Sequence, residues 1–253
     1  MNNLKIFASM EEFEAAKHSM DIPFVVLEKG TSNVIYSNFV EITEEELPEG
    51  VVDLGLSVNW ASCNIGANSP CESGLLFQFG RVDGYEYNDP LHQFRTMEQN
   101  LADTGSSYIP ATTSGTVYKE GEVLKQADDA ASVATKGKMR MPTVTEIDEL
   151  LAGTTNQWCQ CTVLGADHTN HNVYGRLFTS KEDDSKKIFI PAAGYFNGGG
   201  SFNCNGSNGY VWSSSVHADN VYNGYYLHFY SSNCDRDYYI RYYGFSVRGV
   251  CSK

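Results

Sequence analysis

Cysteine is the residue type with the widest chemical reach in this chain, and its spacing predicts neither a metal site nor a catalytic one. The seven cysteines are Cys63, Cys71, Cys159, Cys161, Cys204, Cys234 and Cys251. A zinc site needs wider ligand spacing and a second ligand pair, whereas Cys159 and Cys161 are separated by one residue. The first residues, MNNLKIFASMEEFEAAKHS, lack the basic head and apolar block of a secretory signal. We therefore expect reduced thiols with structural or incidental roles.

Three other groups of residues could bind a cation or a phosphate, and each has a simpler explanation. His168 and His171 lie three residues apart in a turn-rich loop, which is weak evidence for a metal site. The acidic pairs in residues 183–184 and 235–237 could bind a hard cation, but solvated side chains are much commoner. The three glycines at 198–200 lack the Lys-Ser/Thr partner of a phosphate loop. The sequence predicts no metal, no cofactor and no catalytic residue.

The chemistry that the sequence favours is reversible binding, and it is concentrated in residues 188–252. This stretch holds ten of the sixteen Tyr, with nine Gly, nine Ser and seven Asn, so four residue types make up 35 of its 65 residues. Tyr offers a large, rigid contact area at low entropic cost, while Ser, Gly and Asn offer adaptable hydrogen bonds. A turn-rich β surface uses the same residues for structural reasons alone, and this alternative stays open.

The residue types missing from this stretch indicate how it could vary. Lys, Glu, Gln and Met are absent from residues 188–252, and Trp212 is its single Trp. Codons of the form AAY, when both adenines are replaced at random, encode Tyr, Asn, Ser, Gly, His and Asp among others. They cannot encode Lys, Glu, Gln, Met or Trp. The composition therefore predicts a binding surface diversified by mutation of adenines.

Charge and hydropathy exclude two classes of partner. The chain has 253 residues and a formal net charge of −13. An acidic protein of this kind is not expected to bind nucleic acid, which requires a basic patch. It is not expected to bind an anionic membrane surface either. No apolar run approaches the length of a membrane span.

Residues 1–40 predict a small N-terminal α+β module. The sequence LKIFA predicts a strand, and Ser9 with Glu12 forms the capping box that begins a helix. Residues 23–27 and 34–36 predict the two strands of a hairpin. Residues 41–50 follow with five Glu and one Pro, and we interpret them as an acidic linker between two domains. A solvated loop within a single domain is the alternative.

Residues 51–253 predict one α+β domain with few helices. Apolar residues alternate from Val52 to Trp60, as in a strand with one buried face. Residues 82–137 are rich in loop-forming residues, and a hairpin is predicted at 118–124.

The clearest helix of this domain begins after Thr143. Thr143 and Glu146 form a capping box, Pro142 precedes them, and Gly153 ends the helix. Residues 176–180 and 187–191 predict two strands around an acidic–basic turn.

The last strands place the candidate binding residues. In YYLHFY, Leu227 and Phe229 point to one side of a strand and Tyr226, His228 and Tyr230 to the other. The predicted core comprises Trp60, Leu150, Trp212, Leu227, Phe229, Phe245 and Val247. The predicted ligand-binding residues are compatible with AAY codons and are expected on one exposed face: Tyr210, His217, Asp219, Tyr222, Asn223, Tyr226, His228, Tyr230, Asp235, Asp237, Tyr238, Tyr239 and Tyr243.

Five motifs, in this order, resemble a known family: VDLGLSVNWASCNIGA, GKMRMPTVTEIDELL, IPAAGYFNG, YVWSSS and YYGFSVRGV. The chain is similar to the variable proteins of diversity-generating retroelements from gut Bacteroidetes and their phages, over residues 51–253. Met139 and Gly249 stand where such proteins often carry Trp and Pro. The resemblance implies a C-type lectin fold of the formylglycine-generating-enzyme type. It also implies that reverse transcription mutates adenines in a C-terminal variable region, here about 188–252.

The resemblance also implies a function and its alternatives. The expected function is non-enzymatic binding of a cell-surface protein or glycan, for host-cell attachment by a phage. The expected location is the virion tail, or the cytoplasm before assembly; the bacterial cell surface is the alternative. Residues 1–40 could dock on a larger virion protein, and relatives on phage tails are trimers.

Two alternative functions use the same fold. One is a structural or adhesin paralogue with a fixed surface. The other is an oxidase of the formylglycine-generating type, which needs a copper-binding cysteine pair, with Cys204 and Cys251 as the late candidates. The Glu-Pro-Asn, Gln-Pro-Asp and Trp-Asn-Asp strings of calcium-dependent lectins are absent.

Overall fold

The computed structural model describes residues 25–27, 34–37, 50–164 and 170–253. The chain divides into two compact units, Met1–Glu46 and Leu47–Lys253. In the smaller unit, β1 (Val25–Leu27) pairs antiparallel with β2 (Val34–Ser37), which confirms the predicted strand pairing. The predicted strand LKIFA, the helix expected after Ser9 and nearly all of the acidic linker lie outside the described residues.

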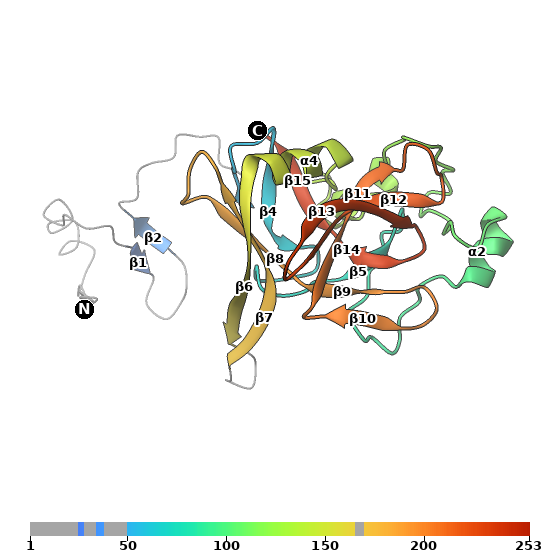
Figure 1. The fold of residues 1–253 in the computed structure, drawn as a ribbon, viewed down its shortest axis with the longest axis horizontal. Coiled ribbons are helices and arrows are strands. Elements are labelled where there is room, and N and C mark those ends of the chain that lie inside the picture. The colour runs from blue at the N-terminus through green and yellow to red at the C-terminus, as the bar shows by residue number, and fades with distance from the viewer. Residues whose placement is uncertain (1–24, 28–33, 38–49, 165–169) are drawn as a thin grey trace, which may run out of the picture. The chain divides into compact units, whose positions relative to one another are not determined.

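The larger unit is a mixed α+β fold made mostly of β-strands with few helices, as predicted (Figure 1). Its described residues form a seven-stranded main sheet in the order β10-β9-β14-β11-β12-β13, with β5 also paired to β14. These strands are β5 (Leu76–Gln78), β9 (Ala193–Phe196), β10 (Phe202–Asn205), β11 (Asn208–Val216), β12 (Asn223–Tyr230), β13 (Cys234–Ile240) and β14 (Gly244–Ser246). All but β5 come from residues 188–252, which we call the Tyr-rich stretch.

Two three-stranded sheets complete the β structure of the described part. One has the order β15-β4-β3 and the other β6-β7-β8. Their bounds are β3 (Val51–Val52), β4 (Val58–Asn64), β15 (Arg248–Ser252), β6 (Thr154–Leu164), β7 (Asn170–Ser180) and β8 (Lys187–Pro191). β7 and β8 pair across the predicted acidic–basic turn. The strand predicted from Val52 to Trp60 is wrong between Asp53 and Ser57, although its apolar residues Leu54 and Leu56 are buried.

The helices are short, and the best-defined one begins where the sequence predicts. They are α2 (Met97–Thr104), the 3-10 helix η2 (Gln126–Asp128), α3 (Ala130–Ala134) and α4 (Val144–Gly153). At the start of α4, the Glu146 N–H donates to Thr143 Oγ1 at 3.3 Å, and the Thr143 N–H donates to Glu146 Oε2 at 2.7 Å. This capping box satisfies two backbone donors at the start of the helix.

The hairpin predicted at residues 118–124 does not form. Its backbone pairs with the end of β11 instead: the Leu124 N–H donates to the Ser214 carbonyl at 2.8 Å, and the Val216 N–H donates to the Glu122 carbonyl at 2.8 Å. β14 pairs with β11 at Val211, so the end of β11 beyond it offers backbone partners that a local hairpin would otherwise have to supply. Pairing with a distant segment therefore replaces pairing within the predicted hairpin, although the turn itself forms, with the Glu122 N–H donating to the Lys119 carbonyl at 3.3 Å.

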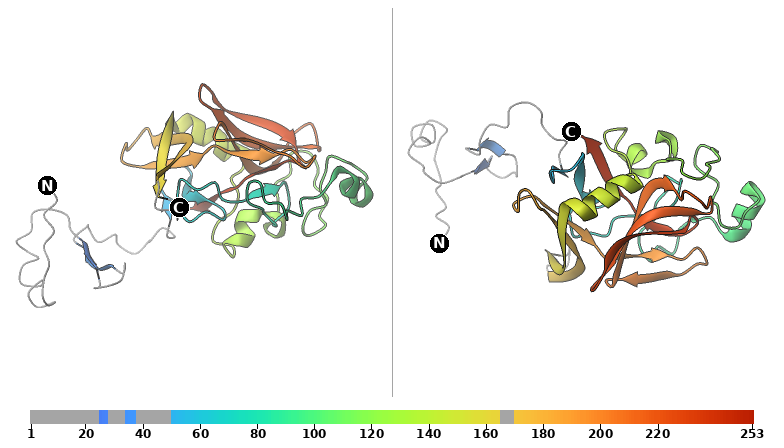
Figure 2. Two further views of the ribbon diagram at one scale, coloured as in Figure 1. Left: turned by 90° about the horizontal axis from the view of Figure 1, so that it is seen from below. Right: turned by 45° about the horizontal axis from the view of Figure 1, so that its top comes forward.

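Two buried clusters lie on opposite faces of the main sheet. On one face, α4 packs against β11, β12 and β13 (Figure 2), and its Leu150 joins Leu227 and Phe229. On the other face, Trp212 and Phe245 pack with side chains from the long irregular segments. All seven predicted core residues are buried, and the Trp212 indole N–H donates to the Phe77 carbonyl at 2.9 Å.

The expectation that every cysteine is reduced is wrong for one pair. Cys71 and Cys161 form a disulfide with their Cα atoms 5.9 Å apart, a separation typical of such bonds. The residues are 90 positions apart, so their spacing in the sequence could not reveal the pair. The other five cysteines are free thiols.

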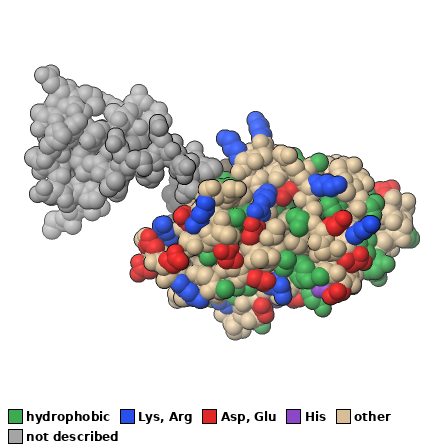
Figure 3. Space-filling model, turned by 90° about the horizontal axis from the view of Figure 1, so that it is seen from above, with side chains coloured by type: hydrophobic (Ala, Val, Ile, Leu, Met, Phe, Trp, Pro, Cys, Tyr) green, Lys and Arg blue, Asp and Glu red, His purple; other side chains and the backbone are tan. Residues whose placement is uncertain are grey.

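Side chains of both charge signs occur on one face of the larger unit. Figure 3 shows a face on which acidic and basic side chains lie interspersed, with apolar side chains between them. No described helix combines the length and apolarity needed to cross a membrane.

Candidate functional site

An aromatic cavity opens on the face of the main sheet that lies opposite α4. Its volume is about 190 Å³. Its lining comes from β9, β11, β12, β13 and the start of β14, and comprises Tyr195, Tyr210, Tyr226, His228, Tyr239, Tyr243 and Phe245. All seven residues belong to the Tyr-rich stretch. We call this group the aromatic cavity.

The register of three antiparallel strands brings the cavity side chains together. Tyr210 of β11 lies opposite His228 of β12, and His228 lies opposite Asp235 of β13. Because side chains alternate along a strand, residues directly opposite one another share a face. Tyr226 and Asp237 form the next such pair. The face therefore carries aromatic rings in the middle and carboxylates at its β13 edge.

The rings pack against one another in pairs around the cavity. Tyr210 and His228 stack with centroids 4.8 Å apart, and Tyr195 and Tyr243 stack at 5.7 Å. Tyr239 meets Tyr243 edge-on at 4.7 Å. Such pairs stabilise each other by about 0.5–1.5 kcal/mol beyond the area they bury. They therefore fix the ring orientations before a ligand arrives.

The cavity lining carries no charge at neutral pH. Burial raises the pKa of Tyr210, Tyr226 and Tyr243 well above the ordinary value near 10, so these hydroxyls stay protonated. Burial lowers the pKa of His228, and the carboxylates of Asp237 and Asp235 only partly oppose this. His228 is therefore a neutral imidazole, and its Nε2 lies 3.3 Å from Asn208 Nδ2.

Beneath the cavity, the same sheet face becomes core. Trp212 lies two residues after Tyr210 in β11 and is fully buried, with Phe245 stacked on it at 4.1 Å. The adjoining serines are also buried, and Ser214 Oγ donates to the Pro142 carbonyl at 3.2 Å. Ser215 Oγ accepts from the Val144 N–H at 3.1 Å. These bonds tie β11 to the start of α4.

Arg248 completes this support from the GFSVR motif. Its side chain is fully buried and donates to Asn64 Oδ1 at 2.9 Å, the Ala61 carbonyl at 2.9 Å and the Phe189 carbonyl at 3.0 Å. A guanidinium can satisfy several acceptors at once because its donors form a rigid fork. The WSSS and GFSVR motifs are buried, as predicted, and we call them the frame.

The predicted binding residues do not all share the cavity face, which corrects the expectation of one patch. Those on the cavity face or beside it are Tyr210, Tyr226, His228, Tyr230, Asp235, Asp237, Tyr239 and Tyr243. Tyr226 is only 4% exposed, so it is a wall residue rather than an open surface residue. Its place opposite Trp212 of β11 brings its ring against the rings of Trp212 and Phe245.

Two of the predicted residues, His217 and Tyr238, lie on the opposite face of the sheet. We call it the helix face because α4 packs there. Tyr238 alternates with Tyr239 along β13, and its ring lies 4.2 Å from that of His217. Tyr225 joins them, with the Arg236 guanidinium 5.4 Å from its ring centroid. Arg236 Nη1 also donates to Asp148 Oδ2 of α4 at 2.9 Å. The remaining predictions, Asp219, Tyr222 and Asn223, lie in or beside the connection between β11 and β12.

Two residues of the cavity were not among the predicted binding residues. Tyr195 belongs to the AAGY motif of β9, and Phe245 was predicted as core alone. Tyr195 lies in the Tyr-rich stretch, so composition could have suggested it. The pairing of β9 with β14 that brings it near Tyr243 joins distant segments, and no local pattern encodes it.

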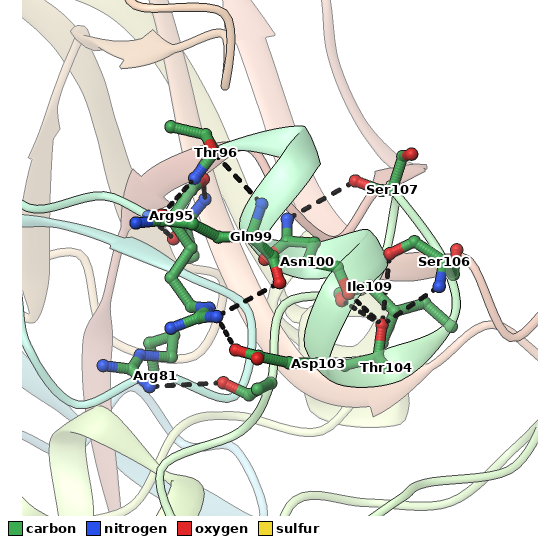
Figure 4. Close-up of polar contacts among 12 residues, drawn as sticks. Arg81, Arg95, Thr96, Gln99, Asn100, Asp103, Thr104, Ser106, Ser107 and Ile109 are labelled. Atoms are coloured by element: carbon green, nitrogen blue, oxygen red, sulfur yellow. Dashed lines mark hydrogen bonds and ion pairs between the residues drawn. The ribbon is translucent and has the colours of Figure 1, made fainter.

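A second hollow, of about 460 Å³, lies beside α2 and carries opposite charges. Figure 4 shows Arg81, Arg95 and Asp103 in its neighbourhood. Arg81 Nε donates to Asp83 Oδ1 at 2.8 Å, and Arg95 forms an ion pair with Asp103. Each guanidinium already has a carboxylate partner, so this hollow offers little free positive charge to an anion.

The structure does not bring the candidate metal ligands or the two late cysteines together among the described residues. Among the described residues, no group of three or more His, Cys, Asp or Glu could hold a metal ion. His168 lies outside the described residues, as does the side chain of His171. Cys204 is exposed on β10, whereas Cys251 is buried on β15 in a different sheet.

Comparison of the chain with protein-family models, with curated proteins and with solved structures finds no match. Function is therefore inferred from the cavity and the frame.

Proposed function

We propose that the chain is a non-enzymatic binding protein whose aromatic cavity and its rim recognise a ligand on a cell surface. The observation that carries the proposal is the position of seven aromatic side chains around one opening, one of which, Phe245, belongs to the fully buried frame. Binding sites for small groups are typically concave and lined by aromatic side chains with a few polar groups, as this cavity is. A rigid support beneath it keeps the contact residues in place.

We further propose that the fold is a C-type lectin fold of the formylglycine-generating-enzyme type and that a retroelement diversifies the cavity. The five sequence motifs support the fold, and two features of the chain support diversification. All seven lining residues are of types that AAY codons can produce, and the single Trp of the stretch, which they cannot produce, is fully buried in the frame. Variation at the six lining residues other than Phe245 would then change the contacts and leave the frame intact.

The proposed biological role is attachment of a phage to its host, with the smaller unit docking on a larger virion protein. A fixed adhesin of the same fold is the alternative. Sequencing the DNA around the gene separates the two, because diversification requires a template repeat and a reverse transcriptase nearby.

Sequencing of the gene from independent isolates tests diversification more directly. We expect substitutions at the codons of Tyr210, His228 and Tyr239, and none at those of Trp212 and Arg248. Equal variation at frame and cavity codons, or no template repeat, would leave the fixed adhesin as the better account.

A further inference from the structure

The aromatic cavity has the composition of a cation-binding cage. Its seven lining residues are five Tyr, one His and one Phe, and none is Lys or Arg. The faces of aromatic rings are negative, so a cage of rings attracts an organic cation that carries little hydration. The volume of about 190 Å³ is smaller than the roughly 300–1,000 Å³ of small-molecule pockets. It suits one chemical group rather than a whole ligand.

The charges around the cavity favour the same ligand. Asp237 Oδ2 accepts from the Tyr226 hydroxyl at 3.3 Å, and Asp235 lies opposite His228 in the neighbouring strand. Both carboxylates are exposed, so they contribute negative potential at the rim without closing the opening. The neutral imidazole of His228 adds no opposing positive charge. An anionic group would meet unfavourable potential here.

On the helix face of the same strands, the chain itself supplies a cation to an aromatic ring. There the Arg236 guanidinium lies over the Tyr225 ring and pairs with Asp148. On the cavity face, no cationic side chain is among the residues that line the opening. The cavity therefore has the rings and the carboxylates of such an arrangement, and the cation has to come from the ligand.

We propose that the aromatic cavity binds a methylated ammonium group carried by the ligand. Methylation lowers the hydration of an ammonium group and enlarges the surface that contacts the rings, which favours a cage over water. Phosphorylcholine and trimethyllysine both carry this group. This inference rests on the proposed function, since it names the ligand chemistry of the same site.

The first test is a titration of the full chain with choline, followed by calorimetry or by NMR of the Tyr and His ring protons. The matched control ligand is 3,3-dimethylbutan-1-ol, which has the same shape without the charge. We expect choline to bind and the neutral alcohol to bind about 3- to 30-fold more weakly. Equal affinity for the two compounds, or no binding of choline, would overturn the proposal.

Matched variants locate the site. Tyr239→Leu removes a cavity ring, and Tyr238→Leu removes the neighbouring ring on the helix face; the two Tyr are 42% and 48% exposed. We expect Tyr239→Leu to weaken choline binding about 3- to 30-fold and Tyr238→Leu to leave it unchanged. Asp237→Asn should weaken it about two- to fivefold, and thermal melts should show that all three variants fold. Equal effects of the two Leu variants would contradict the assignment.

Two further arms separate this inference from the proposed function. Binding of phosphorylcholine is compared with binding of a peptide that contains trimethyllysine, and the tighter one identifies the source of the group. If choline fails to bind while attachment to cells still depends on Tyr239, the cation inference fails and the proposed function stands. If choline binds while attachment does not depend on Tyr239, the proposed function fails instead.

Discussion

The two faces of β12 and β13 carry the same aromatic residue types and use them differently. On the helix face, Tyr225 packs against Tyr238 and lies beneath Arg236, which pairs with Asp148 of α4. On the cavity face, Tyr226, His228 and Tyr239 line an opening with no cationic side chain in its wall. The chain supplies its own partner on one face and leaves the other available. The difference shows that Tyr content alone does not identify a binding site.

The largest loss of stability is expected at Trp212, which lies on the cavity face of the sheet but is buried in the core. Trp212→Ala removes a fully buried ring, its stacking on Phe245 and its hydrogen bond to Phe77. We expect a loss of about 3–5 kcal/mol in the free energy of unfolding, measured by urea denaturation. Tyr239→Ala on the same sheet face should cost less than about 1 kcal/mol. Similar losses for the two variants would show that the cavity wall is part of the core.

A smaller loss of stability is expected when the charge of Glu146 is removed. Glu146 lies in the first turn of α4 and belongs to its capping box. Burial opposes ionisation of Glu146, but hydrogen bonds from Arg140 and Thr143 outweigh it and lower its pKa below the ordinary 4.5. The ionised carboxylate therefore stabilises the fold above about pH 4.5, and this contribution is lost as the pH falls through the lowered pKa.

The matched variant is Glu146→Gln. It should cost about 1 kcal/mol at pH 7, because it removes the charge that pairs with Arg140, while the Gln oxygen can still accept from the Thr143 N–H. Urea denaturation at several pH values should show the difference from the parent closing towards pH 3. A difference that stays constant with pH would mean that the charge of Glu146 contributes nothing.

Arg236, the cation on the helix face, should contribute little to the free energy of unfolding. Arg236 and Asp148 are both largely exposed, with side-chain exposures of 41% and 49%. Arg236→Ala should therefore cost only about 0.5–1 kcal/mol in a thermal or urea melt, and choline binding in the cavity should not change. Loss of choline binding in this variant would show that the two faces are coupled.

The smallest effect is expected from the protonation of His228. The titratable and polar groups that face it are Tyr210, Tyr226, Tyr230, Asn208, Asp235 and Asp237. Its pKa is lowered by burial from the ordinary 6.5, so the ring gains its proton only below that pH. A charged imidazole would repel a bound cation, so choline binding should weaken by up to about threefold as the pH falls below 6.5 and the ring gains its proton. His228→Asn should remove this change; if the change persists, another group causes it.

Local patterns predicted the parts of the fold that local physics decides. Thr143 and Glu146 are three residues apart, so their capping box is visible in the sequence and forms as predicted. The alternation at Leu227 and Phe229 identified the buried side of β12 correctly. In each case, the residues that interact lie within one element or fix which side of it is apolar.

The features that the sequence did not predict depend on distant segments. Alternation placed Tyr226 with the outward residues, yet β14 and β11 cover it with Phe245 and Trp212. Tyr238 was grouped with Tyr239 because both fit the codon pattern, although adjacent residues of a strand point to opposite faces. The parallel pairing of β14 with β11 and the Cys71–Cys161 disulfide also join distant segments.

The most direct test of the account compares two double variants on the same pair of strands. Tyr230→Ala/Tyr239→Ala changes the cavity face, and Tyr225→Ala/Tyr238→Ala changes the helix face; each pair takes one half-buried residue from β12 and one exposed residue from β13. Attachment to the recognised cells and the thermal melt are measured for both. We predict that the first variant loses attachment and keeps its melting temperature within a few degrees, while the second keeps attachment. Attachment lost only in the helix-face variant, or lost equally in both, would contradict the assignment of the binding site to the aromatic cavity.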